Sequence, residues 1–372
     1  MLPYFLLIII PLLFRFVVFR RSEEGARCVR VGCGYEIYSG NVMIPVFFLL
    51  LFLFLALRDE TVGRDLMNYK SMFISYNRRS VEQLLGLDSE MLYALLNWCV
   101  GRFTDNYQWF LAVAAALTLF PIAKVYGEDR RNGYLKLVIF VNMSTFIMLF
   151  SGLRQALAMA VGMIAYRMVR KKKLIWFLIL CLVAYYIHRS GFMILFMYPL
   201  YHLRLKMKHA WFIVPGMLFI LVFNKTVFRA LLPLLTTYTD RYGTEITQTG
   251  AYTMLILFVL FAVFAFVIAD EKKMDQEMFG LRNFLLFAVA LQCFAPLHNL
   301  AMRMNYYYIL FIPILIPKVI ATCKNRYREV AGLANIVLCV FFTAYFAITT
   351  YNSYVTGIST LDTIPYIPFW KG

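Results

Sequence analysis

Apolar runs of 14 to 19 residues recur along the whole chain and are separated by short polar stretches. A helix needs about 20 mainly apolar residues to cross roughly 30 Å of hydrocarbon, and fewer where it only enters the bilayer. The pattern predicts an all-α polytopic membrane protein with about twelve transmembrane helices in one domain, 1–372. The predicted spans lie near residues 2–19, 42–57, 107–125, 134–150, 152–169, 174–187, 190–203, 210–224, 251–269, 282–299, 304–321 and 331–349.

Basic residues in the loops predict the orientation of these spans. When loops are assigned to alternate sides, 24 of the 37 Lys and Arg residues fall on one side and 13 on the other. The richer side is expected to be the cytoplasm. Both termini and two long loops, 58–106 and 225–250, then lie outside. Apolar residues at helical spacing within 82–103 predict an amphipathic helix in the first of these loops.

Composition supports the membrane class. The 372 residues are 62% hydrophobic and only 15% charged, which no soluble globular domain requires. The net charge of +17 is accounted for by the clusters flanking the cytoplasmic ends, so no nucleic-acid partner is predicted. The seven cysteines are scattered and fit neither a zinc site nor a disulfide framework.

Several polar residues remain after the cytoplasmic clusters are set aside. They all fall at or just inside the predicted outer ends of spans, although they are far apart in sequence. This pattern predicts a cavity that opens outward. The residues are Arg58, Asp59, Asp65, Arg154, Gln155, His188, Arg189, His298 and Arg303.

Arg154 and Gln155 follow a Ser-Gly turn and begin a new span. An arginine in the first turn of a helix opposes the helix dipole, which favours anions there. Arg154 is therefore a candidate for binding an anion together with free backbone N–H groups. The alternative is an arginine that snorkels to the interface or pairs with Asp59 or Asp65.

His188, Arg189 and Ser190 lie at the junction of two short apolar runs. A neutral imidazole can accept a proton near neutral pH, which suits general-base work on a hydroxyl group. The alternative is a histidine that only bonds the backbone at a span end. His298 is the rival base.

Arg303 is followed by Asn305 and by tyrosines at 306–308. An aromatic belt at the membrane interface explains such tyrosines, whereas tyrosine and asparagine side chains facing a cavity would bind sugars. Motifs for ATP hydrolysis, zinc proteolysis and serine-hydrolase chemistry are missing from the sequence. No metal and no cofactor are predicted.

Four short motifs together resemble the EpsG family of bacterial exopolysaccharide proteins, relatives of the Wzy O-antigen polymerases. The resemblance runs from about residue 40 to 345, and the order and spacing of the motifs carry its specificity. The motifs are LRDETVGRDLMNYKSMF (57–73), SGLRQALAMAVG (151–162), AYYIHRSGFMIL (184–195) and AMRMNYYYILFIP (301–313).

The resemblance implies a GT-C-type glycosyltransferase that works at the outer face of the bacterial inner membrane. It would act as a polysaccharide polymerase and join repeat units carried on undecaprenyl diphosphate. The residues that match the family's motifs are Arg58, Asp65, Tyr69, Arg154, Gln155, His188, Ser190, Arg303 and Tyr307.

A lipid diphosphate is an activated leaving group, so arginines can stabilise it without a metal. The candidate cations are Arg58, Arg154, Arg189 and Arg303. His188 is the predicted base and Asp65 the reserve. Gln155, Ser190, Tyr69, Asn305 and Tyr307 complete the predicted substrate-binding set. Direct attack of the acceptor hydroxyl would invert the anomeric configuration, whereas retention would require a carboxylate nucleophile such as Asp59 or Asp65.

Three other functions use similar features. A flippase for lipid-linked oligosaccharides would place charges through the depth of its cavity. An O-antigen ligase would use the same donor, and a membrane acyltransferase could use an intramembrane histidine. The predicted partners are undecaprenyl-diphosphate-linked glycans and membrane lipids, with a chain-length regulator as a further candidate.

Overall fold

The computed structural model describes residues 1–13, 20–21, 27–31, 35–87, 90–129, 132–231 and 252–371. The chain divides into two compact units, and each is described by itself. Unit 1 comprises Met1–Leu195 and Asn335–Gly372, and unit 2 comprises Phe196–Ala334. The end of the first predicted span (14–19) and most of the second predicted outer loop (232–250) lie outside the described residues. The prediction of a single domain stays a prediction.

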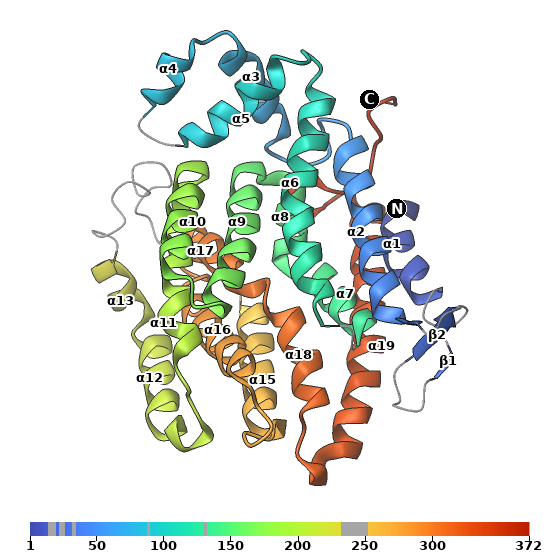
Figure 1. Cartoon of the computed structure of the whole chain (residues 1–372), viewed down its shortest axis with the longest axis vertical. Coiled ribbons are helices and arrows are strands. Elements are labelled where there is room, and N and C mark those ends of the chain that lie inside the picture. Colours follow the sequence, from blue (N-terminus) through green and yellow to red (C-terminus); the bar gives the residue numbers. More distant parts are fainter. Residues whose placement is uncertain are drawn as a thin grey trace. The chain divides into compact units, whose positions relative to one another are not determined.

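Unit 1 is built mainly of helices (Figure 1). Its elements are α1 (Leu2–Leu13), β1 (Arg20–Arg21), β2 (Arg27–Val31), β3 (Tyr35–Tyr38), α2 (Ser39–Leu57), α3 (Leu66–Asn77), α4 (Val81–Leu85), α5 (Met91–Gly101), α6 (Tyr107–Gly127), α7 (Gly133–Val141), α8 (Ser144–Ser151), α9 (Leu153–Arg170), α10 (Leu174–Ile187), most of the 3-10 helix η2 (Arg189–Phe196), most of α19 (Arg328–Thr356) and the 3-10 helix η6 (Thr360–Asp362).

A small sheet precedes α2 and was not predicted from the sequence. Its three strands are antiparallel in the order β1-β2-β3, with Val29 opposite Ile37. The sequence of β2 and β3 is rich in β-branched and aromatic residues and is split by two glycines, which is a hairpin signal. The predominantly helical fold is as predicted, and this sheet is added to it.

Helix α9 is largely buried within unit 1. It packs against α6, α8 and α10. Most of its side chains are buried, and small residues such as Ala156, Ala160 and Gly162 let neighbouring backbones approach closely. The helix therefore holds its N-terminal residues in a fixed position at one end of the unit.

Two predicted spans are bent helix pairs. In unit 1, α7 and α8 meet at 63°, and the Asn142 amide at the bend donates to the Phe342 carbonyl of α19 at 2.9 Å. In unit 2, α17 (Asn299–Ile309) and α18 (Ile312–Ala321) meet at 45°. The side-chain bond at Asn142 satisfies a backbone carbonyl of α19 within the apolar interior.

Unit 2 is wholly helical in the part of the chain that the structure describes. Besides α17 and α18, its elements are α11 (Met197–His202), the 3-10 helix η3 (Met207–His209), α12 (Ala210–Val222), α13 (Asn224–Leu231), α15 (Tyr252–Ile268), α16 (Gln276–Gln292) and the 3-10 helix η5 (Asn325–Tyr327).

Each of the twelve predicted spans overlaps a helix or successive helical segments, although the first is described only as far as Leu13 and the tenth, 282–299, extends past the end of α16 at Gln292. By length and apolar composition, two helices among the described residues can cross a membrane, or up to five if each bent pair counts as one span. Several further apolar helices are shorter. The chain is thus a multi-pass membrane protein, and the exact number of spans stays a prediction.

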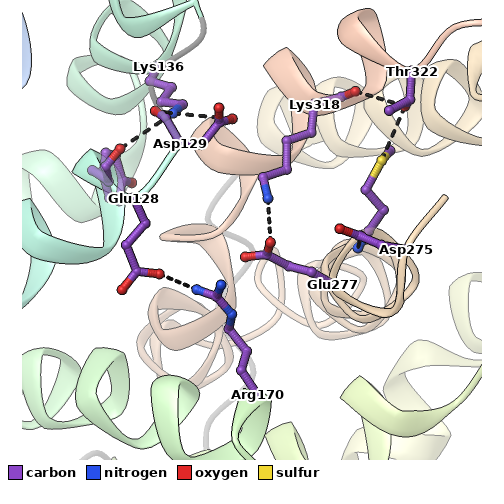
Figure 2. A network of polar contacts seen from close by, with 10 residues as sticks. Glu128, Asp129, Lys136, Arg170, Asp275, Glu277, Lys318 and Thr322 are labelled. Carbon is purple, nitrogen blue, oxygen red and sulfur yellow. Dashed lines mark hydrogen bonds and ion pairs between the residues drawn. The ribbon is translucent and has the colours of Figure 1, made fainter. Parts of the chain in front are cut away.

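Within each unit, loops that the count of Lys and Arg residues assigned to the same side of the membrane contact each other. In unit 1, Glu128 forms ion pairs with Arg170 and, at 2.8 Å, with Arg167. These pairs join loop 124–136 to loop 167–173. In unit 2, Lys318 pairs with Glu277 and so joins loops 272–282 and 318–328. Figure 2 shows the Arg170–Glu128 and Lys318–Glu277 pairs. Their pairing agrees with the alternation of sides assumed from the sequence.

Candidate functional site

The segment between α2 and α6, which contains α3, α4 and α5, closes one end of unit 1. In Figure 1 these helices lie together beyond the ends of α9 and α10. Apolar and aromatic side chains join the segment to α6 and α9 in one buried cluster. Its members include Leu66, Tyr69, Phe73, Tyr93, Tyr107, Phe110, Leu153 and Leu157. Polar groups in this region are therefore surrounded by packed apolar side chains.

Arg154 lies in the first turn of α9 and is paired with a carboxylate that the sequence analysis did not select. Its Nη1 atom contacts Oε2 of Glu90, the residue directly before α5. Arg154 is 8% exposed and Glu90 7%. The N-cap residue Gly152 offers no side-chain oxygen to the first-turn N–H groups. The positive end of the α9 dipole and the guanidinium together make this position strongly attractive to anions.

Two tyrosines flank the Arg154 guanidinium. Its centre lies 5.4 Å from the Tyr69 ring centroid and 5.9 Å from that of Tyr93. Burial raises the pKa of Tyr69, although Arg154 opposes this shift, and burial raises the pKa of Tyr93 well above its usual value. Both phenols are therefore neutral at physiological pH and add no negative charge to the Glu90–Arg154 pair.

His188 joins the same group from the end of α10. Its Nδ1 atom lies 3.9 Å from Oε1 of Glu90, which is too long for a hydrogen bond. The Ser190 backbone N–H donates to Nδ1 at 3.1 Å, and the Ser190 hydroxyl lies at the same distance. We call Tyr69, Glu90, Tyr93, Arg154 and His188 the α9 N-terminal cluster.

Gly191 lets the His188 turn fold tightly against α10. A Cβ atom added at Gly191 would lie 2.5 Å from the Ala184 carbonyl carbon and 2.6 Å from its oxygen. Both are backbone atoms and cannot move aside. Only glycine fits this close approach, so the Arg-Ser-Gly sequence after His188 has a structural reason as well as a chemical one.

Asp65 lies beside the α8–α9 junction. Its backbone N–H donates to the Ser151 hydroxyl at 3.2 Å, and that hydroxyl donates to the Asp65 carboxylate at 3.4 Å. Gly63, with φ of +123°, brings the loop directly against the Phe150 carbonyl. Asp65 is thus placed near the start of α9, but its described contact is with Ser151, three residues before Arg154.

Arg58 is buried at the end of α2. Its guanidinium lies 5.6 Å from the Phe150 ring centroid, and burial lowers its pKa to about 10, an effect opposed by Tyr107, Tyr4 and Tyr366. The group therefore stays charged at neutral pH. Its Nε and Nη1 atoms have no hydrogen-bond partner among the residues that the structure describes.

The C-terminal segment covers the loop that follows Arg58. Asp59 N–H donates to the Ile367 carbonyl at 2.8 Å, and Gly63 N–H donates to that of Asp362 at 2.9 Å. Arg64 forms an exposed ion pair with Asp362 at 3.1 Å. Backbone carbonyls of the C-terminal segment thus hold the Arg58–Asp65 loop.

Two predicted residues of unit 1 have less defined roles. Gln155 is buried next to Arg154 in α9, and Arg189 is half-buried at the start of η2. The structure therefore brings Tyr69, Arg154 and His188 into one cluster, with Ser190 bonded to His188 and Asp65 at the neighbouring junction. The roles predicted for these residues stay predictions.

The remaining predicted residues belong to unit 2. His298 caps α17, where its Nδ1 atom accepts from Leu300 N–H at 3.0 Å. Asn305 is fully buried and its amide donates to Ala288 O and Gln292 Oε1 of α16, both at 2.9 Å. These bonds fit a residue that fastens α17 to α16. Tyr307 is buried and Arg303 is half-buried in α17.

Unit 2 also contains a cavity of about 360 Å³ between α12, α15 and α16. Apolar side chains line it, together with Cys293. Apart from the Cys293 thiol, this lining contains no titratable side chain. Among the described residues, no three His, Cys, Asp or Glu side chains are grouped so that they could hold a metal ion.

Glu90 and Ser151 are the site residues that sequence reasoning missed. Glu90 immediately precedes an apolar helical stretch and stands three residues before Tyr93. This position is the one feature of the sequence that could have indicated Glu90 as a site residue. Its backbone is left-handed, with φ of +60°, a conformation that costs a non-glycine residue roughly 1–2 kcal/mol. This turn directs the carboxylate toward Arg154 and could not be foreseen from composition.

The fold and the cluster define a multi-pass helical membrane protein with a buried Arg154–Glu90 ion pair at the N-terminal end of α9. A family model described as the EpsG family matches residues 41–367, so the chain belongs to that family. The resemblance noted from the four motifs is thereby confirmed. No curated protein and no solved structure matches the chain.

Proposed function

We propose that the protein is a polysaccharide polymerase, a membrane glycosyltransferase that joins repeat units carried on undecaprenyl diphosphate. Its membership of the EpsG family places it in exopolysaccharide biosynthesis. The observation that carries the proposal is the α9 N-terminal cluster, where Arg154 lies at a helix N-terminus beside Glu90 and His188. Such a group suits a reaction with an anionic leaving group and a hydroxyl nucleophile.

The proposed reaction is direct displacement without a metal. A sugar hydroxyl of the acceptor attacks the anomeric carbon of the donor, and undecaprenyl diphosphate leaves. Arg154 stabilises the charge that develops on the diphosphate, with Arg58, Arg189 and Arg303 as the other predicted cations. Direct attack inverts the anomeric carbon.

The reaction is proposed to take place at the outer face of the bacterial inner membrane in a GT-C-like fold. This orientation rests on the basic clusters of loops such as 167–173, which are expected in the cytoplasm. The cluster around Arg154 lies at the opposite end of α9 from that loop. Lipid-linked glycans and, as a further partner, a chain-length regulator would meet the protein at that face.

Reconstitution tests the proposal. The purified protein in proteoliposomes is given undecaprenyl-diphosphate-linked repeat units, and the products are separated by length. We expect a ladder of polymer from the wild type and none from Arg154→Ala or His188→Ala, with both variants inserted and folded. Full-length polymer from both variants would refute the assignment of the site.

The main alternative is a flippase for the same lipid-linked oligosaccharide. Its cavity would need ionisable groups through its depth. In unit 1 the predicted groups gather at one end of α9 instead, which favours transfer chemistry. Movement of a fluorescent lipid-linked glycan across the vesicle membrane, without polymer, would support the flippase. An O-antigen ligase would instead move finished glycan onto a lipid A core.

A further inference from the structure

The hydrogen bonds of His188 bear on its part in the reaction. A backbone N–H can only donate, so the bond from Ser190 N–H at 3.1 Å requires a lone pair on His188 Nδ1. The proton of the neutral ring then lies on Nε2. In this tautomer neither nitrogen can take up a proton unless the bond to Ser190 breaks. His298, the rival base, is held in the same way by Leu300 N–H at 3.0 Å.

Glu90 is the carboxylate within the cluster. Its Oε2 atom contacts Arg154, whereas its Oε1 atom lies 3.9 Å from His188 Nδ1 and is not hydrogen-bonded to it. The Nε atom of Arg154 is buried and has no hydrogen-bond partner among the described residues. Arg154 can therefore donate a hydrogen bond from Nε to a phosphate oxygen while Glu90 is still close to it.

We propose that Glu90 is the general base of the transfer and that His188 is a hydrogen-bond donor through Nε2. This inference rests on the proposed polymerase function. When phosphate oxygens share the Arg154 guanidinium, the hold of that cation on Glu90 weakens. A buried carboxylate that loses its counter-ion takes up a proton more readily. The donor's own diphosphate thus draws Arg154 away from Glu90 at the moment when the leaving group is in place.

Atoms and charge balance in the proposed transfer step. The acceptor oxygen forms a bond to the anomeric carbon, and the bond from that carbon to the bridging phosphate oxygen breaks. The electron pair leaves with undecaprenyl diphosphate, whose charge Arg154 stabilises. The hydroxyl proton passes to Glu90 Oε1. His188 keeps its protons throughout.

Steady-state kinetics of substituted proteins in proteoliposomes test this assignment. Glu90→Gln is expected to lower kcat at least 100-fold, within the range of a lost general base, while the donor KM changes less than threefold. His188→Gln keeps an N–H near the Nε2 position but cannot accept a proton. It should retain at least a tenth of the wild-type kcat, whereas His188→Ala should not. Glu82→Gln, an exposed change in α4, is the matched control.

The opposite results would overturn the inference. A Glu90→Gln enzyme within fivefold of wild-type kcat, or a His188→Gln enzyme as inactive as His188→Ala, would return the base role to His188. If Glu90→Gln does not insert into the membrane, Glu90→Asp serves as the second variant. Glu90→Asp should lower kcat at least tenfold and keep the acidic limb of the pH profile. An unchanged kcat of Glu90→Asp would refute the proposal. A wild type that makes no polymer would instead refute the function on which the inference rests.

Discussion

At the scale of single residues, the pairing of Arg154 with Glu90 is the central feature. The guanidinium stands at the positive end of α9, where it opposes the helix dipole, and the Glu90 carboxylate offsets both charges. The two side chains are about equally buried, so neither charge can be solvated if the other is removed. The arrangement keeps a cation in a place where it would otherwise destabilise the fold.

A double-mutant cycle measures this dependence. Arg154→Met should lower the free energy of unfolding by about 3–5 kcal/mol because it leaves a buried carboxylate without its partner. Adding Glu90→Gln should restore most of the loss, whereas polymer synthesis stays absent. Thermal unfolding in detergent gives the comparison. Equal stability of the single and double variants would show that the two groups are not coupled.

The sequence identified one half of this pair and missed the other. Arg154 and His188 stood out because charged groups are costly within apolar runs. Glu90 lies within 82–103, where the apolar spacing predicted only an amphipathic helix, and its left-handed turn and the packing of Tyr93 bring it to Arg154. Long-range pairing of this kind depends on tertiary structure and has no local signal.

At the scale of elements, the turn from His188 to Gly191 decides where the histidine lies. The turn is pressed against the last turn of α10, so that no side chain fits at Gly191. The same tight fold brings Ser190 N–H to the His188 ring. The position of the imidazole is thus a property of the turn as a whole.

Gly191→Ala should displace this turn. The added methyl group would overlap Ala184 backbone atoms, at a cost of about 1–3 kcal/mol as for other overpacked sites, and the transfer rate should fall with it. Gly216→Ala, in α12 with nothing near the added atom, is the control and should be neutral or slightly stabilising. Equal behaviour of both variants in unfolding and activity assays would contradict the close packing.

The C-terminal segment is a second element whose effect is indirect. Its carbonyls accept the N–H groups of Asp59, Gly63 and Arg64, which hold the Arg58–Asp65 loop. A chain ending at residue 357 should therefore lose activity although it retains the α9 N-terminal cluster. Asp362→Asn weakens only an exposed ion pair and should cost less than about 1 kcal/mol. Full activity of the shortened chain would show that the Arg58–Asp65 loop keeps its conformation without the C-terminal segment.

Element prediction from the sequence succeeded where the apolar pattern was long. All twelve predicted spans overlap helical segments among the described residues, although several of their ends differ. The bends between α7 and α8 and between α17 and α18 were not predicted, because a bent helix pair and a straight helix have the same apolar sequence pattern. The sheet at β1–β3 was not predicted because its strands are short and the basic residues of β1 and β2 are also typical of a loop.

At the scale of the whole molecule, the prediction that remains is the orientation in the membrane. Cys99 in α5 is exposed and belongs to the predicted outer segment, whereas exposed Lys172 belongs to the predicted cytoplasmic cluster. A membrane-impermeant maleimide should label Cys99 in intact spheroplasts. The label should disappear in Cys99→Ser. Lys172→Cys in that background should react only after lysis, and the reverse result would invert the topology.

The most direct measurement of the central claim counts products of the purified wild-type protein. Undecaprenyl-diphosphate-linked repeat units are supplied in proteoliposomes, and released undecaprenyl diphosphate and new glycosidic bonds are measured together. The account predicts one released carrier for each bond formed, a growing polymer ladder, and loss of both in Arg154→Ala. Carrier lipid that crosses the membrane with its glycan intact, and with no new bond, would contradict it.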